Sequence, residues 1–126
     1  MVDHPISLKL QILMLNHNMM TIKVTKEQLA HCREVAAAAI RSIAGRNGKY
    51  ILKKWNCSTT SYTLYNNMPT LVLKVNGKQH QGWVFVSLEE GKDGYVVSLL
   101  NEDHTLKRAV VNVEKEAVRQ VLMDNI

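Results

Sequence analysis

The clearest hydrophobic pattern in the chain lies between residues 26 and 44 and predicts an amphipathic helix. Apolar side chains recur there at spacings of three and four residues, at Leu29, Cys32, Ala36, Ile40 and Ile43. Thr25 precedes this stripe and Gln28 follows Thr25 by three residues, which is the signature of a capping box. Gly45 comes directly after the stripe, where a left-handed helix C-cap is common.

Short apolar or alternating runs follow the helix and are separated by polar turns, which is typical of an antiparallel meander. The expected strands are residues 50–55, 62–65, 70–75, 83–88, 95–100 and 106–111. Asn76 and Gly77 predict a type I′ hairpin turn in which both residues have positive φ. Gly82, inside the next run, indicates a β-bulge.

A second, shorter helical pattern of about ten residues ends the chain. Asn112 is its expected N-cap, and its apolar face consists of Val113, Ala117, Val118, Val121 and Leu122. The elements together predict one α+β domain over residues 25–126. It contains an N-terminal amphipathic helix, a meander of four to six antiparallel strands and a short C-terminal helix, with the helices on one face of the sheet.

Residues 1–24 are expected to be an N-terminal extension of uncertain structure. Leu8, Ile12 and Leu15 fit a helical period, whereas Leu10 and Met14 join Leu8 and Ile12 in a strand period. The extension does not have the basic start and small-residue cleavage site of a signal peptide. A second hypothesis is that translation naturally starts at Met20, which the N-terminal mass of the natively expressed protein would settle.

Composition places the chain among ordinary globular proteins. It is 46% hydrophobic and 21% charged, which is not the composition of a disordered chain. Its apolar runs are too short to cross a bilayer, so no membrane association is expected. The two cysteines, Cys32 and Cys57, match no zinc or redox spacing. We therefore expect a cytoplasmic protein without a metal or other cofactor.

The formal net charge of +5 is unevenly distributed along the sequence. No Asp or Glu occurs between Glu34 and Glu89, so residues 35–88 form an acid-free basic block. Cations that contact phosphates, together with aromatic rings that stack on bases, are what single-stranded nucleic acid binding requires. The candidate nucleic-acid-binding residues are Arg41, Arg46, Lys49, Lys53, Lys54, Trp55, Lys74 and Lys78. The simpler interpretation is a solvated edge hairpin whose lysines discourage aggregation.

The sequence contains no recognisable catalytic, cofactor-binding or metal-binding motif. Its five histidines never occur at the spacing of a helical zinc site, and no phosphate-binding glycine loop or nucleophile elbow is present. Cys57 is the one candidate nucleophile, because Lys53 and Lys54 nearby in sequence could lower its pKa. The alternative is an ordinary polar loop between strands, which we prefer.

Three functions are compatible with these observations. The first is a small binding or adaptor module that acts through a protein partner or as a homodimer. Its expected interface is a sheet face around residues 95–100, which carry apolar side chains on both faces. The second is a nucleic-acid-binding accessory protein that uses the acid-free basic block. The third is a small enzyme with a ligand pocket between helix and sheet, involving Cys57.

Overall fold

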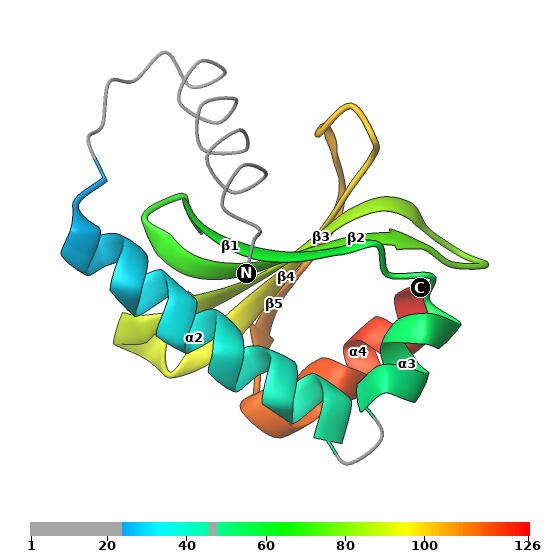
Figure 1. Ribbon diagram of the computed structural model, residues 1–126, viewed down its shortest axis with the longest axis horizontal. Coiled ribbons are helices and arrows are strands. Elements are labelled where there is room, and N and C mark those ends of the chain that lie inside the picture. Colours follow the sequence, from blue (N-terminus) through cyan, green and yellow to red (C-terminus); the bar gives the residue numbers. More distant parts are fainter. Residues whose placement is uncertain (1–23, 46–47) are drawn as a thin grey trace.

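The domain is a five-stranded antiparallel sheet with three helices on one of its faces (Figure 1). The computed structural model describes residues 24–45 and 48–126, so the expected extension up to residue 23 and the proposed start at Met20 lie outside the described residues. The elements follow in the order α2 (Lys26–Ala44), α3 (Gly48–Lys54), β1 (Thr59–Tyr65), β2 (Met68–Asn76), β3 (Gln81–Glu89), β4 (Gly94–Leu100), β5 (Leu106–Val113) and α4 (Val118–Asn125).

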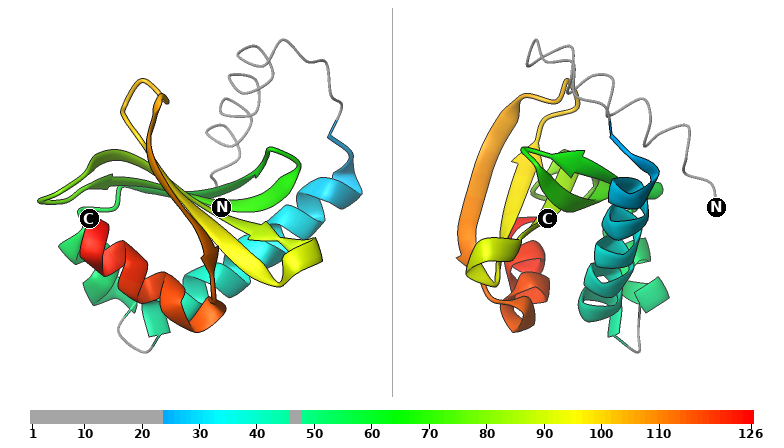
Figure 2. Two further views of the ribbon diagram at one scale, coloured as in Figure 1. Left: turned by 180° about the vertical axis from the view of Figure 1, so that it is seen from behind. Right: turned by 90° about the vertical axis from the view of Figure 1, so that its left-hand side faces the viewer.

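The strands pair in sequence order, β1-β2-β3-β4-β5, and every neighbouring pair is antiparallel. The predicted α+β fold with one long helix, a meander and a short C-terminal helix is therefore confirmed. Figure 2 shows α2, α3 and α4 on the same side of the twisted sheet, while the β4–β5 turn extends away from them. β1 and β5 are consequently the two edges of the sheet.

The long helix begins and packs as its sequence predicts. The Thr25 hydroxyl accepts a hydrogen bond from the Gln28 backbone N–H at 3.1 Å, and the Gln28 side chain accepts one from the Thr25 N–H at 2.8 Å. Gly45 ends the helix with a positive φ of 54°. The small side chains of Ala36 and Ala39 are buried, and they allow the helix axis to lie close to β1 and β2.

The predicted strand over residues 50–55 is wrong, because this segment forms the helix α3. Ile51 and Trp55, four residues apart, are both buried, whereas Tyr50, Lys53 and Lys54 face solvent. This is a helical period, but the run is too short for the sequence alone to distinguish it from a strand. Three helices therefore cover the sheet, where the sequence predicts two.

The predicted type I′ turn at Asn76 and Gly77 is also wrong. Neither residue has a positive φ, and residues 77–80 form a longer loop in which the Gly77 N–H donates to the His80 carbonyl at 2.9 Å. Glycine is needed at position 77 for a different reason. A Cβ there would lie 2.3 Å from the Ile126 carbonyl oxygen.

A two-residue turn with positive φ does occur, between β1 and β2. Asn66 and Asn67 have φ values of 50° and 67°, and the flanking residues Tyr65 and Met68 are paired across the hairpin. Asparagine tolerates this left-handed conformation better than other residues that carry a Cβ. No bulge is found at Gly82, because the β2–β3 register runs through it without a shift.

The C-terminal helix starts later than predicted. Asn112 is not its N-cap but lies within β5, at a register irregularity and with a positive φ of 56°. A 3₁₀ turn over Lys115–Ala117 then leads into α4. The predicted apolar face is confirmed in its position, since Val118 and Leu122 are buried against the sheet.

The apolar core has two parts, one on each face of the sheet. The larger part lies between the sheet and the helices and includes Leu73, Val84 and Val97, none of which is exposed. The smaller part lies on the opposite face and consists of Val72, Phe85 and Leu100, with Tyr65 and Trp83 packed at its margin.

Candidate interaction surfaces

The outer edge of β5 is the most apolar exposed surface among the described residues. Leu106 is 56% exposed and Val111 is 59% exposed, and they account for two of the four large hydrophobic side chains that this part of the chain exposes. Six of the eight residues of β5 are exposed along its length. Because β5 is the last strand of the sheet that the structure describes, its outward backbone N–H and C=O groups have no described strand to pair with and can pair with another strand.

The cations of β5 are held against the body of the domain. Lys107 Nζ donates to the Gln79 carbonyl at 3.2 Å and lies 3.3 Å from Nδ1 of His80. A guanidinium nitrogen of Arg108 donates to the Asn125 side-chain oxygen at 3.1 Å. Lysine and arginine normally protect an edge strand from pairing by projecting over it. Here both side chains are directed to neighbouring loops and α4, which leaves the edge less protected.

The interface expected on β4 is not found in the form that the sequence predicts. Tyr95, Val97 and Leu99 pack under the helices, and Leu100, on the other face, is only 1% exposed. The prediction of an open apolar sheet face around residues 95–100 is therefore wrong. The sequence did not identify Leu106 and Val111 as candidates, because it does not show which strand lies at the edge of the sheet.

A second candidate surface is the outward face of α3, which we call the α3 basic face and define as Tyr50, Lys53 and Lys54. These residues are three and four positions apart and are therefore neighbours on the helix surface. Tyr50 is 68% exposed, the largest exposed fraction among the large hydrophobic side chains described. Neither lysine has a carboxylate within ion-pair distance among the described residues.

The structure brings together only some of the predicted nucleic-acid-binding residues. Arg41 is exposed in the last turn of α2. Arg46 lies outside the described residues, and Lys49 is described only as a backbone position in α3. Trp55 is 3% exposed and belongs to the core, so its ring is not available to stack on a base.

Lys74 and Lys78, the two remaining predicted nucleic-acid-binding residues, lie in different environments. Lys74 Nζ lies 2.9 Å from a Glu102 carboxylate oxygen and 5.3 Å from the centre of the Trp83 ring, so its charge is already neutralised. Lys78 is exposed in the β2–β3 loop and, together with Lys54, lines an open hollow of about 260 Å³. Lys78 therefore extends the α3 basic face, whereas Lys74 does not.

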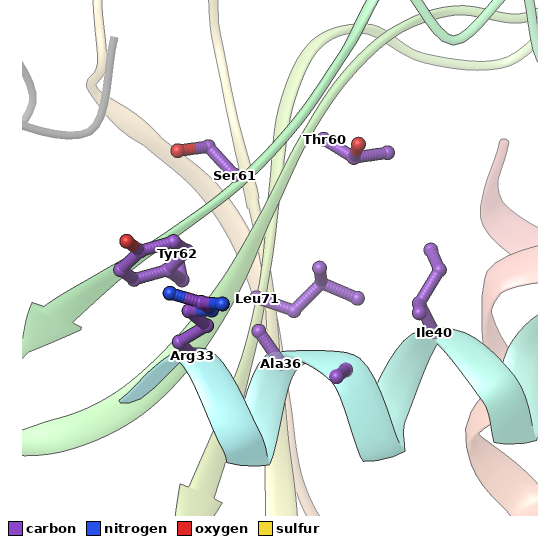
Figure 3. Close-up of a pocket in the computed structure, with 8 residues that line it drawn as sticks. Arg33, Ala36, Ile40, Thr60, Ser61, Tyr62 and Leu71 are labelled. Carbon is purple, nitrogen blue, oxygen red and sulfur yellow. The ribbon is translucent and has the colours of Figure 1, made fainter. Parts of the chain in front are cut away.

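A shallow hollow of about 180 Å³ lies between α2 and β1 (Figure 3). Arg33, Ala36 and Ile40 rise from the helix on one side, and Tyr62 of β1 lies over Arg33 on the other. The hollow is wide open and smaller than the usual 300 to 1,000 Å³ or so of a small-molecule site. No described Cys, His, Asp or Glu contributes to its lining, so it gives no support to the enzyme hypothesis.

Cys57 does not have the environment of an activated thiol. It is half-buried, and burial raises its pKa above that of a free thiol. Its Sγ donates to the Thr59 carbonyl at 3.3 Å. Lys53 and Lys54, which the sequence suggested as activating cations, face solvent on α3. The preferred interpretation, an unactivated polar segment, therefore fits the structure better. Its predicted place between two strands is wrong, because Cys57 connects α3 to β1 and residues 59–61 already belong to β1.

Cys57 is accordingly expected to react slowly with thiol reagents. At pH 7 and 25 °C, labelling by a disulfide reagent should be slower than that of a model thiol, because the thiolate is less populated. Cys57→Ser removes this reaction and serves as the control, since Cys32 is fully buried. Labelling faster than the model thiol would revive the nucleophile hypothesis.

His80 is a buried histidine that the fold keeps neutral. It is 0% exposed, its Nε2 lies 3.0 Å from the Trp83 carbonyl, and Nδ1 faces the Lys107 ammonium. These partners assign the proton to Nε2 and make Nδ1 the acceptor. Burial lowers the pKa of His80, and the nearby positive charge of Lys107 acts in the same direction.

Stability is therefore expected to fall on mild acidification. Since the folded-state pKa of His80 is lowered, the unfolded chain binds more protons once the pH falls below about 6.5. Burial also lowers the pKa of His104, so both histidines act in the same direction. Urea unfolding from pH 7.5 to 5.5 should show this loss, and the loss should be smaller in His80→Gln. If the free energy of unfolding depended on pH in His80→Gln as it does in the unmodified chain, this role of His80 would be refuted.

Other structural signals of function are few in the described part of the chain. Residues 24–45 and 48–126 contain no cluster of His, Cys, Asp and Glu that could hold a metal ion. None of the described helices is long and apolar enough to cross a membrane. No protein-family model, curated protein or solved structure matches the chain.

Proposed function

We propose that this protein is a small binding or adaptor module that self-associates through the outer edge of β5. The observation that carries the proposal is the pair of exposed side chains, Leu106 and Val111, on an edge strand whose own cations are tied back to the domain. A second copy fits this edge because antiparallel pairing about a twofold axis would bring Leu106 of one copy near Val111 of the other. We place the module in the cytoplasm, in keeping with its two free thiols.

Sedimentation velocity at tens of micromolar tests this proposal. The unmodified chain should sediment as a dimer, and lysine at both Leu106 and Val111 should weaken the dimer at least about tenfold, or 1.4 kcal/mol. Met123→Lys is the matched control, because Met123 is 38% exposed but lies on α4. A monomeric unmodified chain, or equal effects of the edge and control variants, would refute self-association through β5.

A second candidate function is single-stranded nucleic acid binding by the α3 basic face. It is supported by one observation, the exposed Tyr50 ring one turn from Lys53 and Lys54, with Lys78 beside Lys54. The ring is positioned to stack on a base, and the cations to contact phosphates. In this hypothesis Tyr50 takes the stacking role predicted for Trp55.

Fluorescence anisotropy with a labelled single-stranded oligonucleotide tests this second candidate. Alanine at both Lys53 and Lys54 should lower the salt dependence of binding, with a log–log slope reduced by about 1.4. Tyr50→Ala should weaken binding by about 1 to 3 kcal/mol with an unchanged slope. Lys92→Ala, an exposed lysine in the β3–β4 connection, is the control. Absence of binding at low salt would make the α3 basic face an ordinary solvated surface.

A further inference from the structure

The side chains of His80 and Lys107 connect the β2–β3 loop to the β5 edge. Lys107 Nζ lies 3.3 Å from His80 Nδ1 and donates to the Gln79 carbonyl at 3.2 Å. Lys107 directly follows Leu106, one of the two exposed apolar side chains of the edge. The contacts with the β2–β3 loop therefore decide whether this cation lies against the domain or beside the edge.

The contact between the two side chains requires a neutral imidazole ring. Nε2 of His80 lies 3.0 Å from the Trp83 carbonyl, so Nε2 carries the proton of the neutral ring and Nδ1 presents a lone pair to the ammonium. In a protonated ring both nitrogens are donors. The Nδ1–H group would then face an ammonium that also only donates, and two positive charges would lie side by side.

The surroundings of His80 do not compensate for this repulsion. Burial and the positive charge of Lys107 on β5 lower the pKa of His80, while the backbone carbonyls of Trp83 on β3 and Leu100 on β4 act in the opposite direction. Among the residues that the structure describes, no carboxylate lies within ion-pair distance of the ring. Protonation therefore displaces Lys107, whose side chain is otherwise exposed and free to move into solvent.

We propose that protonation of His80 weakens self-association through β5, because it releases Lys107 beside the pairing edge. A lysine that projects over an edge strand opposes pairing with another strand. An antiparallel register that sets Leu106 opposite Val111 of a second copy also sets Lys107 opposite Val110 of that copy. The released ammonium would thus enter the interface, next to an apolar side chain.

This regulation rests on the proposed self-association, and the direction of the pH effect follows from linkage. Pairing keeps Lys107 against the β2–β3 loop and so keeps His80 neutral, which means that dimer formation releases protons. By reciprocity, protons must weaken the dimer. The dimer is therefore favoured at neutral pH and dissociates as the pH falls through the titration of His80.

Sedimentation velocity of the full chain at pH 7.5 and 5.0 tests the proposal. The dissociation constant of the dimer should rise at least about threefold at the lower pH. It should be the same at both pH values in His80→Gln, which has no titrating ring, and in Lys107→Met, which has no ammonium to release. His31→Gln is the matched control, because His31 pairs with Glu90 at 2.9 Å, and it should keep the full pH response.

The outcomes of this experiment separate the regulation from the self-association. Equal affinities at the two pH values in the unmodified chain, or an undiminished response in His80→Gln or Lys107→Met, would overturn the regulation and leave the dimer in place. Titration of His104 in the β4–β5 turn would give such an undiminished response in His80→Gln. A monomeric chain at pH 7.5 would refute self-association and, with it, this regulation.

Nuclear magnetic resonance follows the release of Lys107 itself and does not need the dimer. Overhauser contacts between the Lys107 side chain and the His80 ring should be present at pH 7.5 and should disappear as the ring nitrogens become protonated. Contacts between Tyr65 and Phe85, whose ring centroids are 4.9 Å apart, should persist and show that the domain remains folded. Lys107 contacts that survive protonation of the ring, or the joint loss of both sets of contacts, would overturn the proposal.

Discussion

Replacing Phe85 with alanine is expected to lower the free energy of unfolding by about 3 to 5 kcal/mol, the usual cost of truncating a fully buried phenylalanine. Phe85 is 0% exposed at the centre of the face opposite the helices. Its ring meets Tyr65 edge to face with centroids 4.9 Å apart, and this contact adds to the area that is lost. Urea unfolding monitored by far-UV circular dichroism measures the effect.

Leu106→Ala is the matched control for this prediction. It also truncates a large apolar side chain in the sheet, but Leu106 is 56% exposed and should lose no more than about 1 kcal/mol. Equal losses at the two positions would mean that Phe85 is not shielded in solution. That result would contradict the smaller part of the apolar core, which Val72, Phe85 and Leu100 form.

Gly82→Ala is expected to cost at least about 2 kcal/mol, since a strained backbone and forced overpacking each cost about 1 to 3 kcal/mol. Gly82 has a φ of 145°, a conformation that residues with a Cβ rarely adopt. A Cβ at this position would lie 2.3 Å from the Leu100 carbonyl oxygen on β4. Because that atom belongs to the backbone, the strand itself would have to shift.

Gly91→Ala isolates the cause of this loss. Gly91 lies in the β3–β4 connection, and a Cβ there would meet no atom within 4 Å. Its substitution should change stability by no more than about 0.5 kcal/mol, as is usual for surface positions. Thermal unfolding of both variants provides the comparison, and similar losses would argue against the close contact between Gly82 and Leu100.

The parts of the fold that the sequence predicts correctly are those fixed by local chemistry. The capping box at Thr25 and the long apolar stripe determine α2, and alternating runs determine five of the six predicted strands. The errors lie where contacts between residues far apart in the sequence determine the local conformation. α3 is too short for its period to be read, and Gly77 is glycine because of Ile126, which is 49 positions later in the sequence.

The candidate surfaces were less predictable for the same reason. The sequence predicts a basic block, but it does not reveal that Trp55 is buried or that Glu102 neutralises Lys74. It also cannot assign the edge strands, since strand order depends on pairing across the whole sheet. Leu106 and Val111 therefore become candidates only when β5 is placed at the outer edge.

Contact between Leu106 of one copy and Val111 of another is the central expectation of the self-association proposal. Isotope-filtered nuclear Overhauser spectroscopy on a mixture of labelled and unlabelled chains measures it most directly. The proposal predicts intermolecular contacts between the methyl groups of these two residues at concentrations where the dimer is populated. Intermolecular contacts confined to other residues, or their absence at millimolar concentration, would contradict self-association through β5.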